Sequence, residues 1–134
     1  MLTQRWAETP LQVRIIVGAA IAVFSYGTVV HLVQLSGGGT DPYPWAPRWL
    51  AVYFVSPTVL DPLSAALHTL RRCAGLTLGC IVLVTDAAGN AYATYVLDQA
   101  AGRAGQGIIA LLAAALVLTA SRVRPWLNPS RAAP

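Results

Sequence analysis

Two aspartates, Asp61 and Asp86, lie deep inside apolar stretches of the sequence. If these stretches are helices, Asp61 lies about 15 Å and Asp86 about 21 Å from the arginine pair Arg71 and Arg72, so both fall near the centre of a bilayer. No arginine or lysine lies at that depth to pair with them. Because an unpaired carboxylate in lipid is energetically costly, we expect neutral acids that face the protein interior. A protonated aspartic acid there can donate a hydrogen bond or a proton, which makes both residues candidates for catalysis.

Asp86 has a polar neighbour at helical spacing. Asn90 follows it by four residues, so the two side chains share one face of a helix. The pair admits two interpretations, a functional site or hydrogen bonds that join helices, and the acid is the costlier choice for the second role. We predict that Asp86 is the first catalytic candidate, in a polar and aromatic pocket open towards the outer leaflet. The candidate ligand-binding residues are Asn90, Tyr53, Ser56, Tyr26, His31 and Tyr92, although the tyrosines and His31 also suit a membrane interface.

Two prolines interrupt the segment that carries Asp61. Pro57 removes one backbone N–H and frees the carbonyl of Tyr53, and Pro62 does the same further along, so this helix is predicted to kink or break. Asp61 directly before Pro62 is typical of a helix start with aspartate as the N-cap. We therefore predict two half-helices with Asp61 capping the second, which makes it the weaker catalytic candidate. A neutral Asp86 is expected to donate to the freed Tyr53 carbonyl.

Lipid must be the solvent for most of this chain. Of its 134 residues 56% are hydrophobic and 10% charged, and the mean hydropathy is +0.59, far from the composition of soluble domains. We predict a single all-α membrane domain over residues 1–134, a polytopic four-helix transmembrane bundle whose second helix is broken by proline. The predicted spans are about 11–35, 49–70, 73–97 and 107–120, with loops at 36–48 and 98–106 and a disordered tail at 127–134. We expect the first span to be a retained anchor rather than a cleaved signal peptide, since its apolar run exceeds the usual ~7–15 residues and no cleavage site follows.

The basic residues are all arginines, and they gather on one side of the predicted spans. That side carries Arg5, Arg14, Arg71, Arg72, Arg122, Arg124 and Arg131, whereas only Arg48 and Arg103 fall on the other. By the positive-inside rule we expect a multi-pass protein of the plasma membrane, such as a bacterial inner membrane, with both termini cytoplasmic. Arginines at the ends of apolar runs meet lipid head groups, so we expect membrane lipids as neighbours and no nucleic acid as a partner.

Several chemistries lack the residues they need. His31 and His68 are predicted on opposite membrane sides, so they cannot share a metal or a haem. No zinc-protease, phosphate-loop or serine-hydrolase motif is present. Cys73 and Cys80 lie about 10 Å apart along one predicted helix, beyond the reach of a disulfide. We expect neither a metal nor a cofactor.

Three short stretches resemble known proteins: residues 44–53 (PWAPRWLAVY), 56–63 (SPTVLDPL) and 85–92 (TDAAGNAY). On these stretches the chain resembles a group of small four-span bacterial membrane proteins, a likeness that implies a topology but no activity. Its size and span count are also similar to those of the EXPERA superfamily, which includes emopamil-binding sterol isomerases and sigma-2-receptor-like proteins. That similarity implies an apolar ligand held by Asp86, Asn90 and nearby aromatic residues, with proton transfer to or from a carbon–carbon double bond.

Three functions fit these features. The first is the binding, and the isomerisation or cyclisation, of a hydrophobic small molecule at an intramembrane Asp/Asn/Tyr pocket. The second is a structural or accessory subunit whose polar residues only join helices to each other or to a membrane partner. The third, a proton-coupled transporter, requires oligomerisation because four short helices enclose little volume. Gly75 and Gly79, four residues apart, permit a homodimer.

Overall fold

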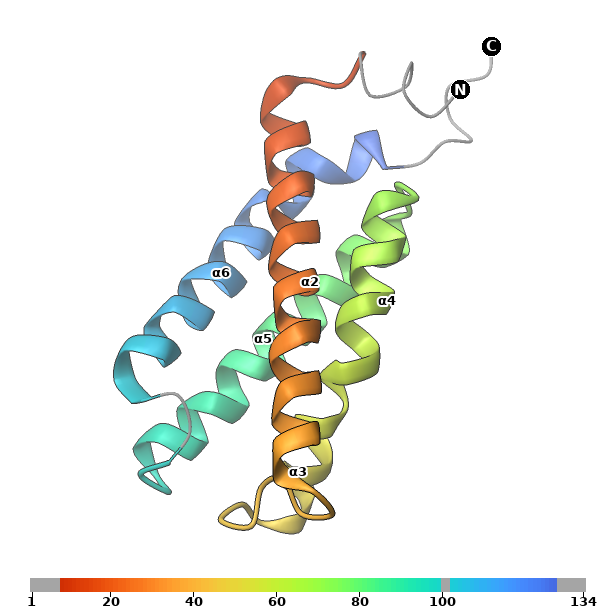
Figure 1. Cartoon of the computed structure of the whole chain (residues 1–134). Helices are drawn as coiled ribbons and strands as arrows, with labels where there is room; N and C mark the ends of the chain where they lie inside the picture. The colour runs from red at the N-terminus through yellow and green to blue at the C-terminus, as the bar shows by residue number, and fades with distance from the viewer. Residues whose placement is uncertain (1–7, 100–101, 128–134) are drawn as a thin grey trace.

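The computed structural model describes residues 8–99 and 102–127, and the regular elements in those ranges are all helical (Figure 1). In chain order they are α2 (Leu11–Gly38), α3 (Arg48–Val55), α4 (Pro57–Thr69), α5 (Cys73–Tyr95), α6 (Gly102–Val123) and the 3₁₀ helix η1 (Arg124–Trp126). Four segments are long and apolar enough to cross a membrane: Leu11–Gly38, Arg48–Thr69, Cys73–Tyr95 and Gly102–Trp126. The prediction of an all-α fold with four membrane-spanning segments is therefore confirmed.

The helices extend further than the predicted spans in two places. α2 continues through Gly37 and Gly38, which were expected in a loop, and α6 begins at Gly102, inside the loop predicted over 98–106. Glycine costs a helix only about 1 kcal/mol relative to alanine, and a backbone in lipid must satisfy its own hydrogen bonds, so these glycines continue the helices.

The predicted disordered tail over 127–134 is wrong at its first residue. Leu127 is 1% exposed and packs in the core with residues of α2 and α6, directly after η1. A large apolar side chain loses contact with water when it packs there, which explains why the chain stays ordered through this position. The remainder of the predicted tail, residues 128–134, lies outside the described residues.

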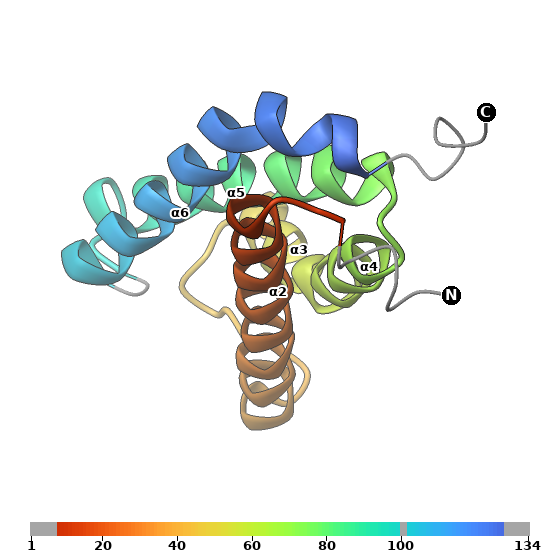
Figure 2. The ribbon, with the colours of Figure 1, turned by 90° about the horizontal axis from the view of Figure 1, so that it is seen from above.

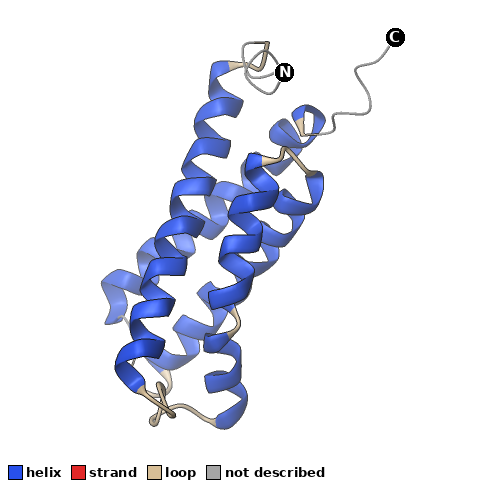
Figure 3. Ribbon diagram, turned by 45° about the vertical axis from the view of Figure 1, so that its right-hand side comes forward, coloured by secondary structure: helices blue, strands red, loops and turns tan. Residues whose placement is uncertain are grey.

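The break in the second span falls at Ser56. α3 ends at Val55 and α4 begins at Pro57, and Figure 3 shows the interruption as a short tan segment between two helices. The predicted break by proline is present, but the prediction that Asp61 caps the second half-helix is wrong. Asp61 and Pro62 both lie inside α4. The helix is already interrupted directly before Pro57, and α4 tolerates the loss of one further backbone hydrogen bond at Pro62.

One end of the bundle, here called the arginine end, holds the start of α2, the α4–α5 turn and η1 (Figure 1). Its arginines are Arg14, Arg71, Arg72, Arg122 and Arg124. The opposite end, called the loop end, holds residues 39–47 and the short connection after α5. Arg71 ties the arginine end together, since its Nη2 donates to Thr9 Oγ1 at 3.1 Å and to the Trp126 carbonyl at 2.6 Å.

The helices pack as two unequal groups that diverge towards the loop end. α2 packs mainly against α4, and α5 lies between α4 and α6. Figure 2 shows the first turns of α2 beside α6 and its later turns pointing away from α5 and α6, in agreement with Figure 1. The main apolar core, which includes Val17, Phe24, Leu76 and Leu116, therefore lies towards the arginine end. Near the loop end the divergence leaves room for a cavity.

Small residues set the close contact between α5 and its neighbours. A Cβ added at Gly75 would lie 2.8 Å from the backbone nitrogen of His68 on α4, and one added at Gly79 would lie 2.9 Å from the ring of Phe24 on α2. The glycine pair that permits a homodimer is thus used for packing within the chain, as small residues in membrane helices commonly are. A homodimer stays a prediction, but without these glycines to support it.

Candidate functional site

A cavity of about 750 Å³ opens between α2, α5 and α6 near the loop end. Asp61 of α4, Phe54 of α3 and the 42–45 segment complete its wall. The polar side chains that line it are His31, Gln34, Tyr43, Asp61, Asp86, Asn90 and Gln99. Most of the remaining lining is apolar and includes Val23, Val30, Leu83, Ile108, Ile109 and Leu112. Both intramembrane aspartates therefore face one space, although they come from different helices.

Asp86 and Asn90 form the polar floor of the cavity on α5. Asn90 Nδ2 donates to Asp86 Oδ1 at 3.1 Å and to the Asp86 carbonyl at 3.0 Å, so the amide orients the carboxyl group within one helical turn. The predicted bond from Asp86 to the freed Tyr53 carbonyl is not what the structure shows. That carbonyl accepts the backbone N–H of Ser56 at 2.9 Å and the Ser56 hydroxyl at 2.7 Å, so the helix break satisfies itself locally.

Asp61 enters the cavity from α4 and packs against α2. It is 5% exposed, and its carboxyl group lies against Gly27, where an added Cβ would overlap it. The nearest basic group is His31, whose Nε2 lies 3.9 Å from Asp61 Oδ2. Glycine at position 27 is what leaves space for an acid between the two helices.

His31 lies inside the protein, with its side chain 14% exposed, rather than at the outer interface that sequence favoured. The difference follows from the true end of α2. The helix continues to Gly38, which places His31 about 10 Å before its end instead of about 6 Å. His31 Nδ1 is buried and makes no hydrogen bond of good geometry to the described residues, although Gln34 lies close enough to interact with the ring.

Tyr43 closes the loop end of the cavity, and sequence reasoning missed it. Its hydroxyl donates to Gln34 Oε1 at 2.9 Å and lies 3.4 Å from the Phe54 carbonyl, while its ring packs against Trp45 and Phe54. Burial raises the pKa of Tyr43, so the phenol stays protonated and remains a donor. The aromatic residues of the 43–45 segment were the available signal, within the loop predicted over 36–48.

Gln106 is a second polar residue that sequence reasoning missed. It lies buried in the first turns of α6 and its Nε2 donates to the Ala87 carbonyl on α5 at 3.0 Å. It does not line the cavity, but its hydrogen bond joins α6 to α5 at the residue that directly follows Asp86. Its polarity in an otherwise aliphatic span was the available signal, which was lost because position 106 was assigned to a loop.

The remaining predicted site residues divide between the cavity and other surfaces. Tyr26 lines the cavity and is 73% exposed, so it lies at the lateral opening rather than on the inner wall. Tyr53 faces α5 but bonds to Thr85 Oγ1 at 2.9 Å, away from the cavity lining. Tyr92 packs against Trp49, and Ser56 lies at the helix break. The structure thus brings Asp61, Asp86, Asn90, His31 and Tyr26 together, and it places Tyr53, Ser56 and Tyr92 elsewhere.

The arrangement has a definite chemical capacity. Two carboxyl groups, three amides, one imidazole and the Tyr43 hydroxyl line a space whose remaining lining is mostly apolar. Two neighbouring carboxylates in lipid are costly without a cation, so the cavity suits protonated acids, a cationic group or a ligand rich in hydrogen-bond donors. Within residues 8–99 and 102–127 no group of three metal-binding side chains occurs.

No protein-family model, curated protein or solved structure matches this chain. The geometry of the cavity therefore carries the argument for function.

Proposed function

We propose that this protein binds a hydrophobic small molecule in the cavity between α2, α5 and α6. The observation that carries the proposal is the pair of acids, Asp61 and Asp86, at the polar end of a mostly apolar space of about 750 Å³. A volume of this size is typical of small-molecule sites, and a few convergent polar groups in an apolar pocket are their usual composition.

The ligand enters sideways from the lipid. The opening is formed by exposed side chains of α2 and α6, of which Tyr26 is 73% and Ile108 60% exposed. The buried Tyr43 cluster with Trp45 and Phe54 lies between the cavity and the loop end. An apolar body can lie in the opening while its polar head reaches the acids, which is the kind of ligand that the likeness to the EXPERA superfamily implies.

The polar groups suit a proton-transfer step as well as binding. To isomerise or cyclise an alkene, the protein must supply a proton donor to one carbon and a proton acceptor for a proton on another carbon of the same ligand. Asp86, oriented by Asn90, is the proposed donor. Asp61, beside His31, is the proposed acceptor. Water is kept from this exchange by the apolar surroundings.

The proposed location is the plasma membrane, with the arginine end on the cytoplasmic side. Five of the described arginines lie on helix ends or turns there, against Arg48 and Arg103 at the loop end. The cavity then opens in the outer half of the bilayer.

The test is the identity of what purifies with the protein. Protein in mild detergent is extracted with organic solvent, and the extract is compared by mass spectrometry for the wild type, Asp86→Asn and Asp98→Asn. Asp98 is an exposed acid outside the helices with a φ of 53°, a conformation that asparagine also accepts, so it is the matched control. We expect one enriched compound that Asp86→Asn loses by about tenfold or more while Asp98→Asn retains it.

Two results would count against the proposal. One is the same extract from all three proteins, provided that Asp86→Asn elutes and unfolds like the wild type. The other is a stoichiometric membrane protein that co-purifies with both the wild type and Asp86→Asn, which is the outcome expected of an accessory subunit.

A further inference from the structure

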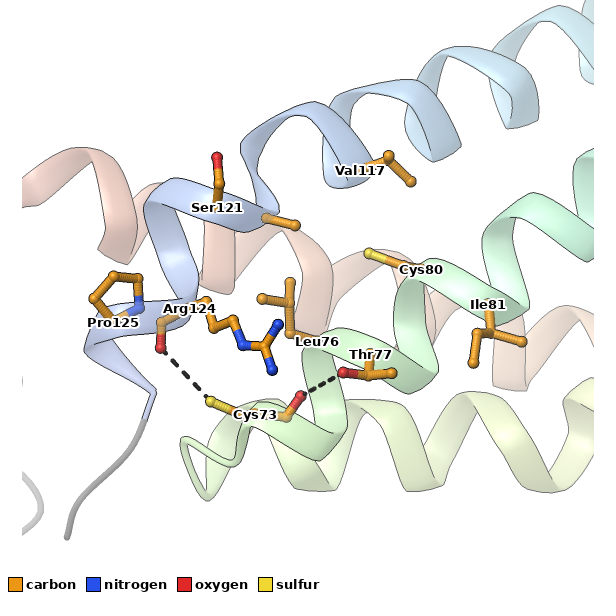
Figure 4. A pocket seen from close by; sticks show the side chains of 10 residues that line it. Cys73, Leu76, Thr77, Cys80, Ile81, Val117, Ser121, Arg124 and Pro125 are labelled. Atoms are coloured by element: carbon orange, nitrogen blue, oxygen red, sulfur yellow. Dashed lines mark hydrogen bonds between the residues drawn. The ribbon is translucent and has the colours of Figure 1, made fainter. Parts of the chain in front are cut away.

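A second cavity lies between α5 and α6 at the arginine end, apart from the acids. Its volume is about 890 Å³, and Figure 4 shows its lining from close by. The wall farther from the arginine end is apolar or weakly polar and includes Leu76, Cys80, Ile81 and Val117. The wall at the arginine end of the bundle is formed by Arg124 and Pro125 of η1.

Arg124 gives this groove its charge. Figure 4 shows its guanidinium group extending from η1 towards α5, into the space beside Leu76 and Thr77. The Cys73 thiol donates a weak hydrogen bond to the Arg124 carbonyl at 3.6 Å, which links η1 to the first turn of α5.

No carboxylate of the described residues pairs with Arg124. Asp61 and Asp86 line the other cavity, and Asp41 and Asp98 lie at the loop end. Glu8, before α2, is the remaining acid of the chain and makes no ion pair with Arg124. No carboxylate among the described residues therefore neutralises this guanidinium group, which leaves it available to an anion from outside the chain.

We infer that the groove between α5 and α6 binds an anionic phospholipid, with its phosphate on Arg124 and one acyl chain along Cys80, Ile81 and Val117. A soluble anion would bind to the arginine but would make no contact with the apolar wall. An uncharged lipid would contact the apolar wall but would not pair with the arginine. A phospholipid fits both, since its phosphate lies at the membrane surface and its chain runs into the bilayer beside it. This site is independent of the proposed function, so either can fail alone.

Native mass spectrometry of the full chain, with phosphatidylglycerol or phosphatidylcholine added at equal concentration, tests the inference. Arg124→Gln removes the charge in the groove, and Arg122→Gln removes an equal charge from an exposed position two residues away that does not line it. We expect the wild type to retain phosphatidylglycerol over phosphatidylcholine. Arg124→Gln should retain about fivefold less phosphatidylglycerol, and Arg122→Gln should retain nearly as much as the wild type.

A second pair of variants tests the apolar wall without changing charge. Val117→Trp fills the groove, whereas Leu118→Trp adds the same ring at a neighbouring position that is 77% exposed and does not line it. We expect only Val117→Trp to lose phosphatidylglycerol. Equal losses for Arg122→Gln and Arg124→Gln would overturn the inference in favour of diffuse surface attraction. A dimer mass that Val117→Trp abolishes, with no lipid bound, would overturn it in favour of a second copy of the chain.

Discussion

Glycines decide which side chains can meet between the helices. Gly27 leaves room for the Asp61 carboxyl group, and Gly75 and Gly79 let α5 approach α4 and α2. By contrast, Gly18 on α2 has open space where a Cβ would be placed. The same residue type therefore has different consequences at different positions.

Gly75→Ala is expected to destabilise the protein by about 1–3 kcal/mol. Its new methyl group would lie 2.8 Å from the α4 backbone, which cannot move aside as a flexible side chain can. Gly18→Ala is the control and should be neutral or stabilising by up to about 1 kcal/mol, because it improves helix propensity in open space. Thermal unfolding in detergent measures both. Equal effects of the two substitutions would contradict the close contact between α4 and α5.

Local spacing predicted one half of the acid site but not the other. Asp86 and Asn90 are four residues apart on one helix, so their contact follows from helical geometry alone. The approach of Asp61 to His31 depends on which of two prolines breaks the second span and on where α2 ends. The sequence favours neither proline as the site of the break, and the prediction of a break before Pro62 made Asp61 a helix cap instead of a cavity residue.

At the scale of elements, Arg71 joins three segments that are distant in the chain. Its guanidinium group bonds to Thr9, before α2, and to the Trp126 carbonyl in η1, while the residue itself lies in the α4–α5 turn. Its φ of 55° is unusual for a residue with a side chain, which indicates that the turn is held in place by its surroundings.

Arg71→Gln should lower the free energy of unfolding by about 1–3 kcal/mol, the range for hydrogen bonds that involve a charged group. Glutamine keeps the same backbone cost at positive φ, so the change reports the lost guanidinium contacts. Arg72→Gln, at the exposed neighbouring position, is expected to change stability by less than about 0.5 kcal/mol. Chemical or thermal unfolding in the same detergent compares them. Similar losses for both variants would show that the charge of the turn matters rather than the contacts of Arg71.

The presence of the four membrane-spanning helices could be predicted from the sequence, but the residues at which they begin and end could not. Hydropathy identifies four apolar segments because lipid requires long self-satisfied helices. The glycines Gly37, Gly38 and Gly102 are residues typical of loops and were predicted in loops, but they lie within α2 and α6. Because the predicted helix ends were wrong by a few residues, His31 was predicted too close to the membrane surface and Gln106 was assigned to a loop.

For the whole molecule, charge asymmetry predicts orientation. The described arginines of the arginine end outnumber those of the loop end, and α2 begins at the same end where α6 finishes (Figure 1). We expect a fluorescent protein fused after the last residue to fluoresce and to resist protease added outside intact cells. A fusion that is cleaved from outside would contradict the proposed orientation while leaving the fold unchanged.

The cavity itself is a property of the whole molecule that sequence could not show. It exists because α2 leans away from α6 towards the loop end, and this divergence results from packing against α4 rather than from any local pattern (Figure 2). Sequence indicated that acids, an amide and aromatic residues lie at similar depth. Only the arrangement of the helices decides which of them share a space.

The most direct test of the central claim is whether filling this cavity removes a bound molecule. Val30 lines the cavity from α2, whereas the neighbouring Val29 is exposed and does not line it, so Val30→Trp and Val29→Trp form a matched pair. Native mass spectrometry from mild detergent should show a small-molecule adduct on the wild type and on Val29→Trp but not on Val30→Trp. An adduct of the same mass and abundance on all three proteins, or none on the wild type, would contradict ligand binding in this cavity.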